Sequence, residues 1–357
     1  MSFLSGTYYT IIQIVAVLFG LGLLIFIHEL GHFSMAKFYK VKVLKFAFGF
    51  GKELWGFTKG ETRYSVCLFP FGGMVAMAGE NPEEATGKEG EFLSLNWFKK
   101  IMIVFAGPFM NYVLAFLLFA FCFSVWGIAD ISEKPIIGAL AQDQCAQKAG
   151  LQTGDNILYI GDTEIKVWKD IVPALKDKAN KETKVIAERN GEKLEFNILI
   201  DENPNTKVGM LGIQPQINKE KCSFVEAIKL GFNTCIFQST FTLVYLWEKI
   251  VTWEKPEVAG PIGVIQVMAK SAKSGIESYV RLLAVISVAL GLFNLLPIAL
   301  VDGGMIVLFL EEAIIRKKIN LKVIQVYNTI GLSLILLIFL FATYNDLIRL
   351  GIGKLFQ

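Results

Sequence analysis

Long apolar stretches constrain this chain more than any other feature of its sequence. Across residues 11–27 only Gln13 is strongly polar, and a run of this length can cross a bilayer as a helix. Hydrophobic residues make up 54% of the 357 and charged residues only 19%, which is typical of a membrane protein. Three further stretches have the same character, at residues 101–126, 282–301 and 323–343. The sequence therefore predicts a polytopic α-helical membrane protein with four transmembrane helices.

Basic residues predict the orientation of these spans, because cytoplasmic loops carry an excess of lysine and arginine. The loop between the first two spans is rich in lysine and should be cytoplasmic, which puts the polar segment after the second span outside. The basic cluster at residues 316–318 then returns to the cytoplasm. A further crossing at residues 228–251 would place this basic cluster outside the cytoplasm. Polar residues such as Asn233 also interrupt that segment. We expect an interfacial or packed helix there.

Residues 135–217 have the composition of a soluble domain. Strands are expected at residues 136–140, 156–161, 183–190 and 192–200, and helices near 143–149 and 168–178. GLQTGDNILYIGD resembles a PDZ sequence, and LGIQP at 211–215 resembles the carboxylate-binding loop of circularly permuted bacterial PDZ domains. The resemblance implies that Leu211, Gly212 and Ile213 bind peptide, and an unrelated small α/β domain is the alternative. The expected divisions are 1–127 with two spans, 135–217 as a PDZ-like domain, 218–278 as a helical linker and 279–357 with two spans.

The only two histidines of the chain lie in the sequence HELGH, inside the first apolar stretch. Residues four apart project from the same face of a helix, so His28 and His32 can both bind one zinc ion as neutral imidazoles. Glu29 beside them is suited to act as general base on a zinc-activated water. Ionisable groups in a membrane span cost several kcal/mol and are usually tolerated only for function. A chance match with a role in helix packing is the alternative.

A third zinc ligand must be an aspartate, a glutamate or a cysteine, because no other histidine exists. Asp302 is the best candidate by depth. At about 1.5 Å per residue, His28 lies roughly 25 Å along its stretch and Asp302 roughly 30 Å along the third stretch. Both stretches start from the same side of the membrane, so both residues arrive near the cytoplasmic end. The same shortage of histidine argues against a Ser-His-Asp or Cys-His apparatus.

Together, HELGH and NLLPIALVDGG at residues 294–304 resemble the site-2 protease family of intramembrane zinc proteases, in its bacterial regulator-of-sigma-E form. Further matching stretches are FGFGKELW at 48–55, FPFGGMVAM at 69–77, AGPFMN at 106–111 and GPIGV at 260–264. The resemblance implies that His28, His32 and Asp302 bind one zinc ion per chain. Glu29 would be the base, and Asn294 would hold substrate or stabilise the tetrahedral intermediate.

The resemblance also implies where the protein works and on what. It implies a bacterial inner membrane, a periplasmic PDZ-like domain and an active site near the cytoplasmic side. The substrates would be single-pass membrane proteins already trimmed outside, such as anti-sigma factors, and leftover signal peptides. The best-known members carry two PDZ domains, whereas this chain has room for one. Details of how substrates are admitted therefore do not transfer directly.

A membrane-reentrant β-hairpin at about residues 43–78 is a further implication of the resemblance. An unwound substrate would add to it as a strand, contacting Gly49, Gly51, Gly72 and Gly73. A peptide bond inside a transmembrane helix is shielded until the helix unwinds. Pro297 and the neighbouring glycines would break the backbone near the metal, and Pro297 is expected at the substrate. Plain turns and an ordinary kinked span are the alternatives.

Two other functions remain as alternatives. A non-catalytic PDZ adaptor with a structural metal site would not need Glu29, since structural sites need ligands but no base. A zinc transporter would be expected to carry more His, Asp or Glu along its spans. A net charge of only +3 argues against nucleic-acid binding.

Overall fold

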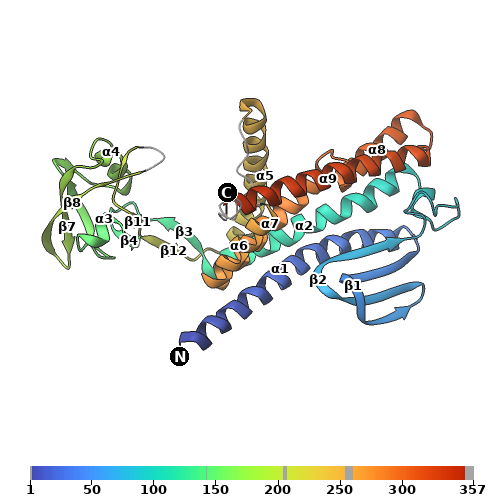
Figure 1. Cartoon of the computed structure of the whole chain (residues 1–357), viewed down its shortest axis with the longest axis horizontal. Coiled ribbons are helices and arrows are strands. Elements are labelled where there is room, and N and C mark those ends of the chain that lie inside the picture. Colours follow the sequence, from blue (N-terminus) through green and yellow to red (C-terminus); the bar gives the residue numbers. More distant parts are fainter. Residues whose placement is uncertain (1, 142, 204–206, 254–259, 350–357) are drawn as a thin grey trace. The chain divides into compact units, whose positions relative to one another are not determined.

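The computed structural model describes residues 2–141, 143–203, 207–253 and 260–349. The chain divides into two compact units. Unit 1 combines residues 1–124 with residues 223–357, and unit 2 is the inserted segment 125–222. Figure 1 shows the elements of both units. The spans therefore belong to a unit that is discontinuous in sequence, because its two halves pack together across the insertion.

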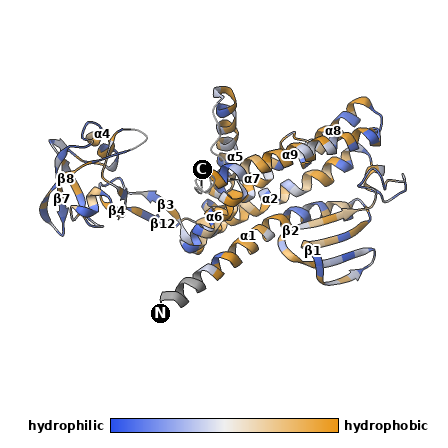
Figure 2. Cartoon of the chain, viewed as in Figure 1, coloured by the Kyte–Doolittle hydropathy of each residue, from blue (hydrophilic) through white to orange (hydrophobic). Residues whose placement is uncertain are grey.

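Four long helices of unit 1 are apolar enough to cross a membrane. They are α1 (Ser2–Phe38), α2 (Trp97–Trp126), α7 (Ile276–Leu295) and α9 (Leu321–Arg349). Figure 2 shows the hydrophobic colouring along these helices. The first, second and fourth predicted stretches fall inside them, as do residues 282–295 of the third, so the prediction of four candidate spanning helices is confirmed. The third stretch is the exception in extent, because its helix begins six residues earlier and ends before Val301.

The chain breaks its helical conformation after α7, before it reaches Asp302. Leu296 is extended, as the residue before a proline usually is, and Pro297 has no N–H with which to continue a helix. Leu300 has a φ of +78°, a conformation that is strained for a bulky residue. The chain then enters α8 (Asp302–Ile315), with Asp302 as its first residue. The third stretch is therefore a helix and a turn rather than one continuous span.

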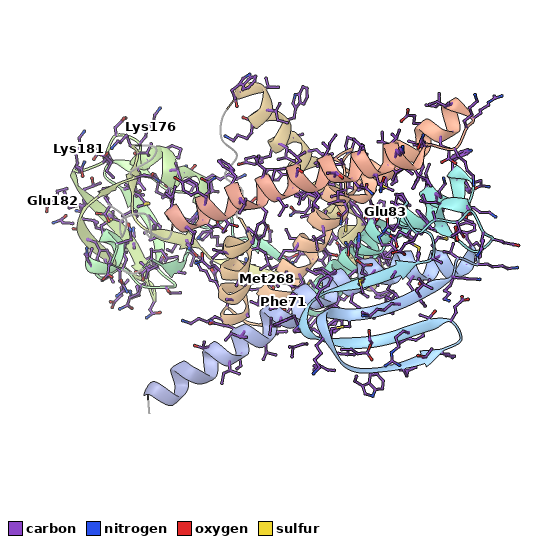
Figure 3. The ribbon with its side chains drawn as sticks, turned by 45° about the vertical axis from the view of Figure 1, so that its right-hand side comes forward. Phe71, Glu83, Lys176, Lys181, Glu182 and Met268 are labelled. Carbon is purple, nitrogen blue, oxygen red and sulfur yellow. The ribbon has the colours of Figure 1, made fainter. Side chains whose placement is uncertain are left out.

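Helix α6 packs within unit 1 against the first span. In α6 (Pro261–Lys273), Met268 is fully buried against α1, where Gly20 leaves room for its side chain. Figure 3 labels Met268 at this position. Tyr279 of α7 donates a hydrogen bond to the carbonyl of Ala16 at the same place. These contacts connect the first span to the second half of the chain.

The segment 228–251 lies in α5 (Phe224–Thr252). Ser223 and Glu226 form a capping box at its N-terminus. Among the described residues, α5 is not one of the helices that reach the length and hydropathy of a membrane span. It nevertheless exposes large apolar side chains, including Phe237 and Trp247. These features agree with a helix that lies at an interface or packs on the bundle, which stays a prediction.

Two long antiparallel strands, β1 (Val43–Lys59) and β2 (Thr62–Met77), form a hairpin that packs on α1. Residues 45–48 of β1 pair with residues 63–66 of β2 on one side and with residues 73–76 on the other, and the register shifts repeatedly along both strands. Gly49 and Gly72 have positive φ, and a Cβ at Gly49 would collide with the carbonyl of Phe69. Glycine is therefore required where the two strands approach most closely. A short 3-10 helix (Phe92–Ser94) connects the hairpin to α2.

Unit 2 contains a four-stranded sheet in the order β6-β5-β7-β8. These strands are β6 (Thr163–Glu164), β5 (Asn156–Ile160), β7 (Glu182–Arg189) and β8 (Glu192–Leu199). The predicted turn between the last two holds, with positive φ at Asn190 and Gly191. The short pairs β4 (Ile137–Leu140) with β11 (Ile213–Pro215) and β9 (Asp201–Glu202) with β10 (Gly209–Met210) complete the core. Aliphatic side chains from the sheet and helices are buried between them.

Unit 2 differs from the sequence prediction at its edges and in its helices. It extends beyond residues 135–217 because β3 (Ile128–Ile131) pairs with β12 (Ile217–Glu220). The helix predicted near 143–149 is the single turn α3 (Cys145–Lys148). The helix predicted near 168–178 is a 3-10 turn (Trp168–Asp170) followed by α4 (Ile171–Leu175). Trp168, Ile171 and Leu175 turn toward the core of the unit.

Candidate metal centre

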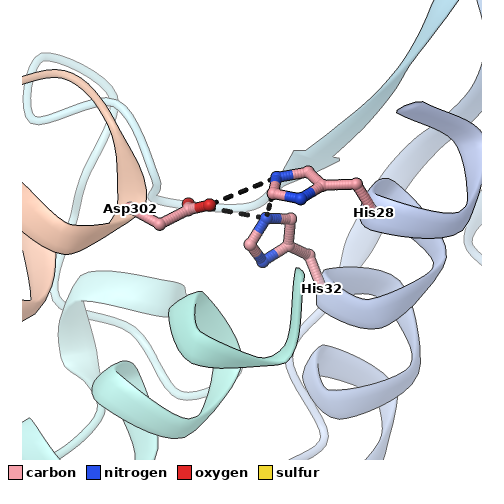
Figure 4. A group of neighbouring side chains, drawn as sticks. All are labelled: His28, His32 and Asp302. Atoms are coloured by element: carbon pink, nitrogen blue, oxygen red, sulfur yellow. Dashed lines mark hydrogen bonds and ion pairs between the residues drawn. The ribbon is translucent and has the colours of Figure 1, made fainter. Parts of the chain in front are cut away.

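The two histidines and the aspartate meet in space. Nε2 of His28 lies 3.2 Å from Oδ2 of Asp302, and Nε2 of His32 lies 3.5 Å from Oδ1. The two Nε2 atoms are 3.1 Å apart. Figure 4 shows the three side chains converging, the rings from α1 and the carboxylate from α8. Residues 28 and 302 are thus neighbours although 274 positions of sequence separate them.

This arrangement fits a bound cation. The three ligand atoms all lie within 4.8 Å of one another. Two imidazole Nε2 atoms that face each other can both present a lone pair only if a positive charge lies between them. Within the described part of the chain, Oδ2 of Asp302 is buried without a hydrogen-bond partner, so an acceptor is left for such an ion. Two imidazoles and one carboxylate match the ligand set of catalytic zinc sites, which keep a further position open.

Local structure explains why these side chains converge. The i, i+4 spacing on α1 stacks both rings on one face of the helix. Helix α2 approaches that face at glycines, because a Cβ at Gly31 would overlap the carbonyl of Ala106. A Cβ at Gly107 would overlap the ring of His32 and lie 2.9 Å from that of His28. Asp302 begins α8, where the helix dipole favours a negative side chain.

Each histidine has a second partner on α2. Nδ1 of His32 lies 2.9 Å from the carbonyl oxygen of Ile103, which can only accept, so this nitrogen carries the proton. The Nε2 lone pair of His32 is then directed toward Asp302. Nδ1 of His28 lies 3.2 Å from the side-chain amide of Asn111. Both rings are therefore positioned through the nitrogen that faces away from the carboxylate.

Glu29 lies beside this group and contacts the hairpin. The N–H of Val75 in β2 donates to Oε2 of Glu29 at 3.2 Å. Gly73 lies against the side chain of Glu29, where a Cβ would come within 3.0 Å of Cγ. A cavity of about 500 Å³ opens here between the hairpin, α1 and the end of the α7–α8 break. Its lining includes His28, Glu29, His32, Gly73, Asn294 and Asp302.

Several residues of this cavity have no assigned role from the sequence. They are Phe50, Met74, Val75, Met77, Glu80, Phe92, Val104, Leu300, Val301, Met305 and Asn328. The N–H of Met77 donates to Oε2 of Glu80 at 3.1 Å. Desolvation by the surrounding protein raises the pKa of Glu80 to about 7, and the Glu29 and Asp302 carboxylates add to this rise. Glu80 lies three residues beyond the end of the FPFGGMVAM stretch, which is the only sequence signal for it.

The other predicted substrate residues lie elsewhere. Gly49, Gly51, Gly72 and Pro297 are not among the described residues that line this cavity. The Cα of Gly72 faces the ring of Phe50, which does line it. Gly49, Gly51 and Gly72 serve the close approach of the two hairpin strands, and Pro297 serves the end of α7. Direct substrate contact by these four residues stays a prediction.

Leu211, Gly212 and Ile213 line a separate cavity of about 590 Å³ within unit 2. Trp168, Ile171, Val172 and Leu175 form an apolar wall of the same cavity. Gly212 has a φ of +72°, and a Cβ there would overlap the side chain of Gln144. A loop and a helix thus flank a groove beside a short strand, as peptide binding by strand addition requires.

Comparison with known proteins identifies the family. The model of Peptidase family M50 matches residues 16–338. A relative from Clostridium acetobutylicum, named as a zinc metalloprotease, is 33% identical over 94% of this chain and 97% of its own length. Another with that name, from Rickettsia conorii, is 31% identical over 94% of this chain and 98% of its own. The regulator of sigma-W protease RasP of Bacillus subtilis is 28% identical over 94% and 98%.

Among solved structures, a PDZ domain of an SdrC-like protein from Listeria monocytogenes covers 25% of this chain and 93% of that chain. Its identity is 15% and its TM-score 0.22, which is too low to decide the fold of unit 2. The family match, by contrast, spans both halves of unit 1 and the insertion between them. This chain belongs to Peptidase family M50, the site-2 proteases.

Proposed function

We propose that this protein cleaves peptide bonds inside the transmembrane segments of single-pass membrane proteins. Its family and the names of its relatives make it a zinc metalloprotease of the membrane. The convergence of Asp302 with His28 and His32, which lie within a candidate membrane span, carries the rest of the proposal. A water-dependent reaction placed there is suited to a substrate that is itself embedded in the bilayer.

Each residue of the site has a proposed task. His28, His32 and Asp302 would hold one zinc ion, which when bound supplies Lewis-acid activation of a water molecule and of the substrate carbonyl. Glu29 takes a proton from the attacking water and passes it to the leaving amine nitrogen. The Val75 N–H keeps the Glu29 carboxylate oriented while it does so. The Asn294 amide lines the same cavity and donates to the oxygen on which negative charge develops.

The hairpin would hold the unwound substrate. A transmembrane helix satisfies its backbone hydrogen bonds internally, so a strand-like partner must replace them before hydrolysis. Strand β2 passes directly beside Glu29, which places a backbone edge next to the proposed base. The hairpin also exposes large apolar side chains such as Trp55, Phe69 and Phe71, the last labelled in Figure 3. These favour a hairpin that re-enters the membrane.

Unit 2 would be a PDZ-like domain on the periplasmic side of a bacterial inner membrane. The lysine-rich loop between the first two spans favours this orientation, with the metal centre near the cytoplasmic side. Its groove at Leu211, Gly212 and Ile213 would dock or sort substrates already trimmed outside. RasP is by name a regulator of sigma-W, so anti-sigma factors are the first substrate class to try, followed by remnant signal peptides.

The test compares wild type with Glu29→Gln in membranes that contain a tagged single-pass substrate. Loss of a general base should slow cleavage by about 100- to 10,000-fold. Zinc content should be equal in the two proteins, because Glu29 is not a proposed ligand. Mass spectrometry of the wild-type products should place the cut inside the apolar segment of the substrate. Equal cleavage by both proteins, or a cut outside that segment, would contradict the proposal.

A further inference from the structure

The two histidines of the site differ in what holds their outer nitrogens. His32 donates to a backbone carbonyl, which leaves no choice of tautomer. His28 faces a side-chain amide, which can present either an NH₂ donor or an oxygen acceptor to the ring. If the NH₂ faces Nδ1 of His28, that nitrogen must accept and the proton lies on Nε2. An Nε2–H would point at Asp302 and His32 and could not bind a metal.

The amide oxygen of Asn111 supplies the other solution. This oxygen is buried and has no hydrogen-bond partner among the residues that the structure describes. Nδ1 of His28, which could donate to it, lies 3.2 Å from the nitrogen of the same amide group. A half-turn of the amide exchanges its oxygen and nitrogen at almost no cost in shape. We infer that Asn111 is a positioning residue whose oxygen accepts Nδ1–H of His28, so that the Nε2 lone pair is held toward the metal.

The surroundings of Asn111 support this role. Its side chain is fully buried in α2, a helix that is otherwise apolar over this turn. Its backbone carbonyl accepts a hydrogen bond of 2.8 Å from Ser287 of α7, which fixes this turn of α2 against the neighbouring span. A polar side chain placed so deeply among spanning helices is costly unless it is used. Partners of this kind orient a ligand ring and raise its basicity.

The test measures zinc affinity by chelator competition on the purified full-length protein. Asn111→Asp keeps an acceptor and removes the NH₂, whereas Asn111→Leu has a similar volume and no acceptor. Asn111→Asp should bind zinc within about threefold of wild type, and Asn111→Leu about 10- to 100-fold more weakly. Phe119→Leu, a buried change on the same helix away from the metal, is the matched control. Wild-type affinity in Asn111→Leu, or equal loss in folded Asn111→Asp, would overturn the inference.

A second measurement does not need Asn111→Asp, which adds a negative charge beside the site. In cobalt-substituted protein, proton NMR should show an exchangeable Nδ1–H signal for each ligand histidine. Asn111→Leu should exchange one of them rapidly with solvent and leave the other, because His32 still donates to Ile103. Unchanged slow exchange of both signals would also overturn the inference. This inference rests on the proposed zinc site. A wild-type protein that binds no metal would refute that site. Equal zinc binding by wild type and Asn111→Leu would refute only the role of Asn111.

Discussion

Gly107 lies where α2 meets the two histidine rings. A Cβ at this position would overlap Nε2 of His32, the atom that faces Asp302. The following residue, Pro108, leaves the carbonyl one turn earlier without its helical partner, so α2 is already irregular here. A side chain at residue 107 would therefore either push α2 away or occupy the position of the metal.

We expect Gly107→Ala to lose zinc even though alanine favours a helix. The added methyl group competes with the ion for the same space, so zinc affinity should fall by at least about tenfold, the lower range for altered metal surroundings. Zinc per chain measured by mass spectrometry after dialysis against a weak chelator reports this. Leu117→Ala, an exposed change on the same helix, should keep its zinc. Full zinc content in Gly107→Ala would show that the site is wider than described.

At this scale the sequence predicts some residues well and others not at all. His28, Glu29 and His32 lie within one helical turn, so their meeting follows from local geometry. Asp302 is predicted from an estimate of depth along two spans and from the resemblance of NLLPIALVDGG at residues 294–304. Asn111 contacts His28 from a second helix, and Glu80 lines the cavity just beyond the end of the hairpin. Both lie in or near stretches that match the family, but those stretches give neither residue a role, because only the packing of distant segments brings them to the site.

The strands of unit 2 depend on one buried carboxylate. Asp155 is almost completely buried and accepts hydrogen bonds from Nε and Nη2 of Arg189 at 2.7 and 2.8 Å. It also accepts from the N–H of Gln152 at 2.8 Å, which closes the turn before β5. Burial by itself would raise the pKa of Asp155, but Arg189 and the Gln152 N–H outweigh it and lower this pKa. The ionised form is therefore the one that the folded unit stabilises.

Asp155→Asn should destabilise unit 2 by about 1–3 kcal/mol at neutral pH, since it weakens charged hydrogen bonds at a buried site. Hydrogen exchange of peptides from residues 135–217 in the full-length protein measures this. Because the folded pKa is lowered, the contribution is present above the unfolded value of about 3.9 and disappears as the pH falls through the lower folded value. Wild type and variant should converge in strong acid. A difference that persists there would assign the effect to shape rather than charge.

Helices and strands were predicted well where local sequence determines them and poorly where distant segments do. Turn chemistry predicted the β7–β8 hairpin, because Asn190 and Gly191 tolerate positive φ. Pairing of β3 with β12 was missed, since 85 residues separate the two strands and neither is long or strongly apolar. The third span was drawn too far because hydropathy continues through Val301, whereas Pro297 and the strained Leu300 end the helix. The end of this helix is therefore set by backbone geometry, which hydropathy does not report.

At the scale of the whole molecule, an inserted unit interrupts a bundle that carries the site. If unit 2 sorts substrates, replacing residues 135–217 by a short flexible linker should let untrimmed substrates be cleaved. Both halves of unit 1 remain in this variant, and the β3–β12 pair loses only Ile217. Gly212→Val is the companion change, because its Cβ would overlap Gln144 and distort the groove without removing the unit.

Cleavage of a matched pair of trimmed and untrimmed substrates in membranes measures the selectivity. A size filter predicts that only the deletion relaxes selectivity, whereas docking through the groove predicts that Gly212→Val also changes it. Unchanged selectivity in both variants would remove the sorting role from unit 2. The hydrolytic site in unit 1 would be unaffected by that result.

The most direct test of the site as a whole is zinc X-ray absorption on the purified full-length protein. Two helices far apart in sequence, α1 and α8, would share one ion. The spectrum should therefore show two imidazole nitrogens at about 2.0–2.1 Å and carboxylate or water oxygen at about 2.0–2.2 Å. Asp302→Ala should change the oxygen shell and leave both imidazoles. Sulfur at about 2.3 Å, which would indicate a cysteine ligand, or fewer than two imidazoles in wild type would contradict a centre built from His28, His32 and Asp302.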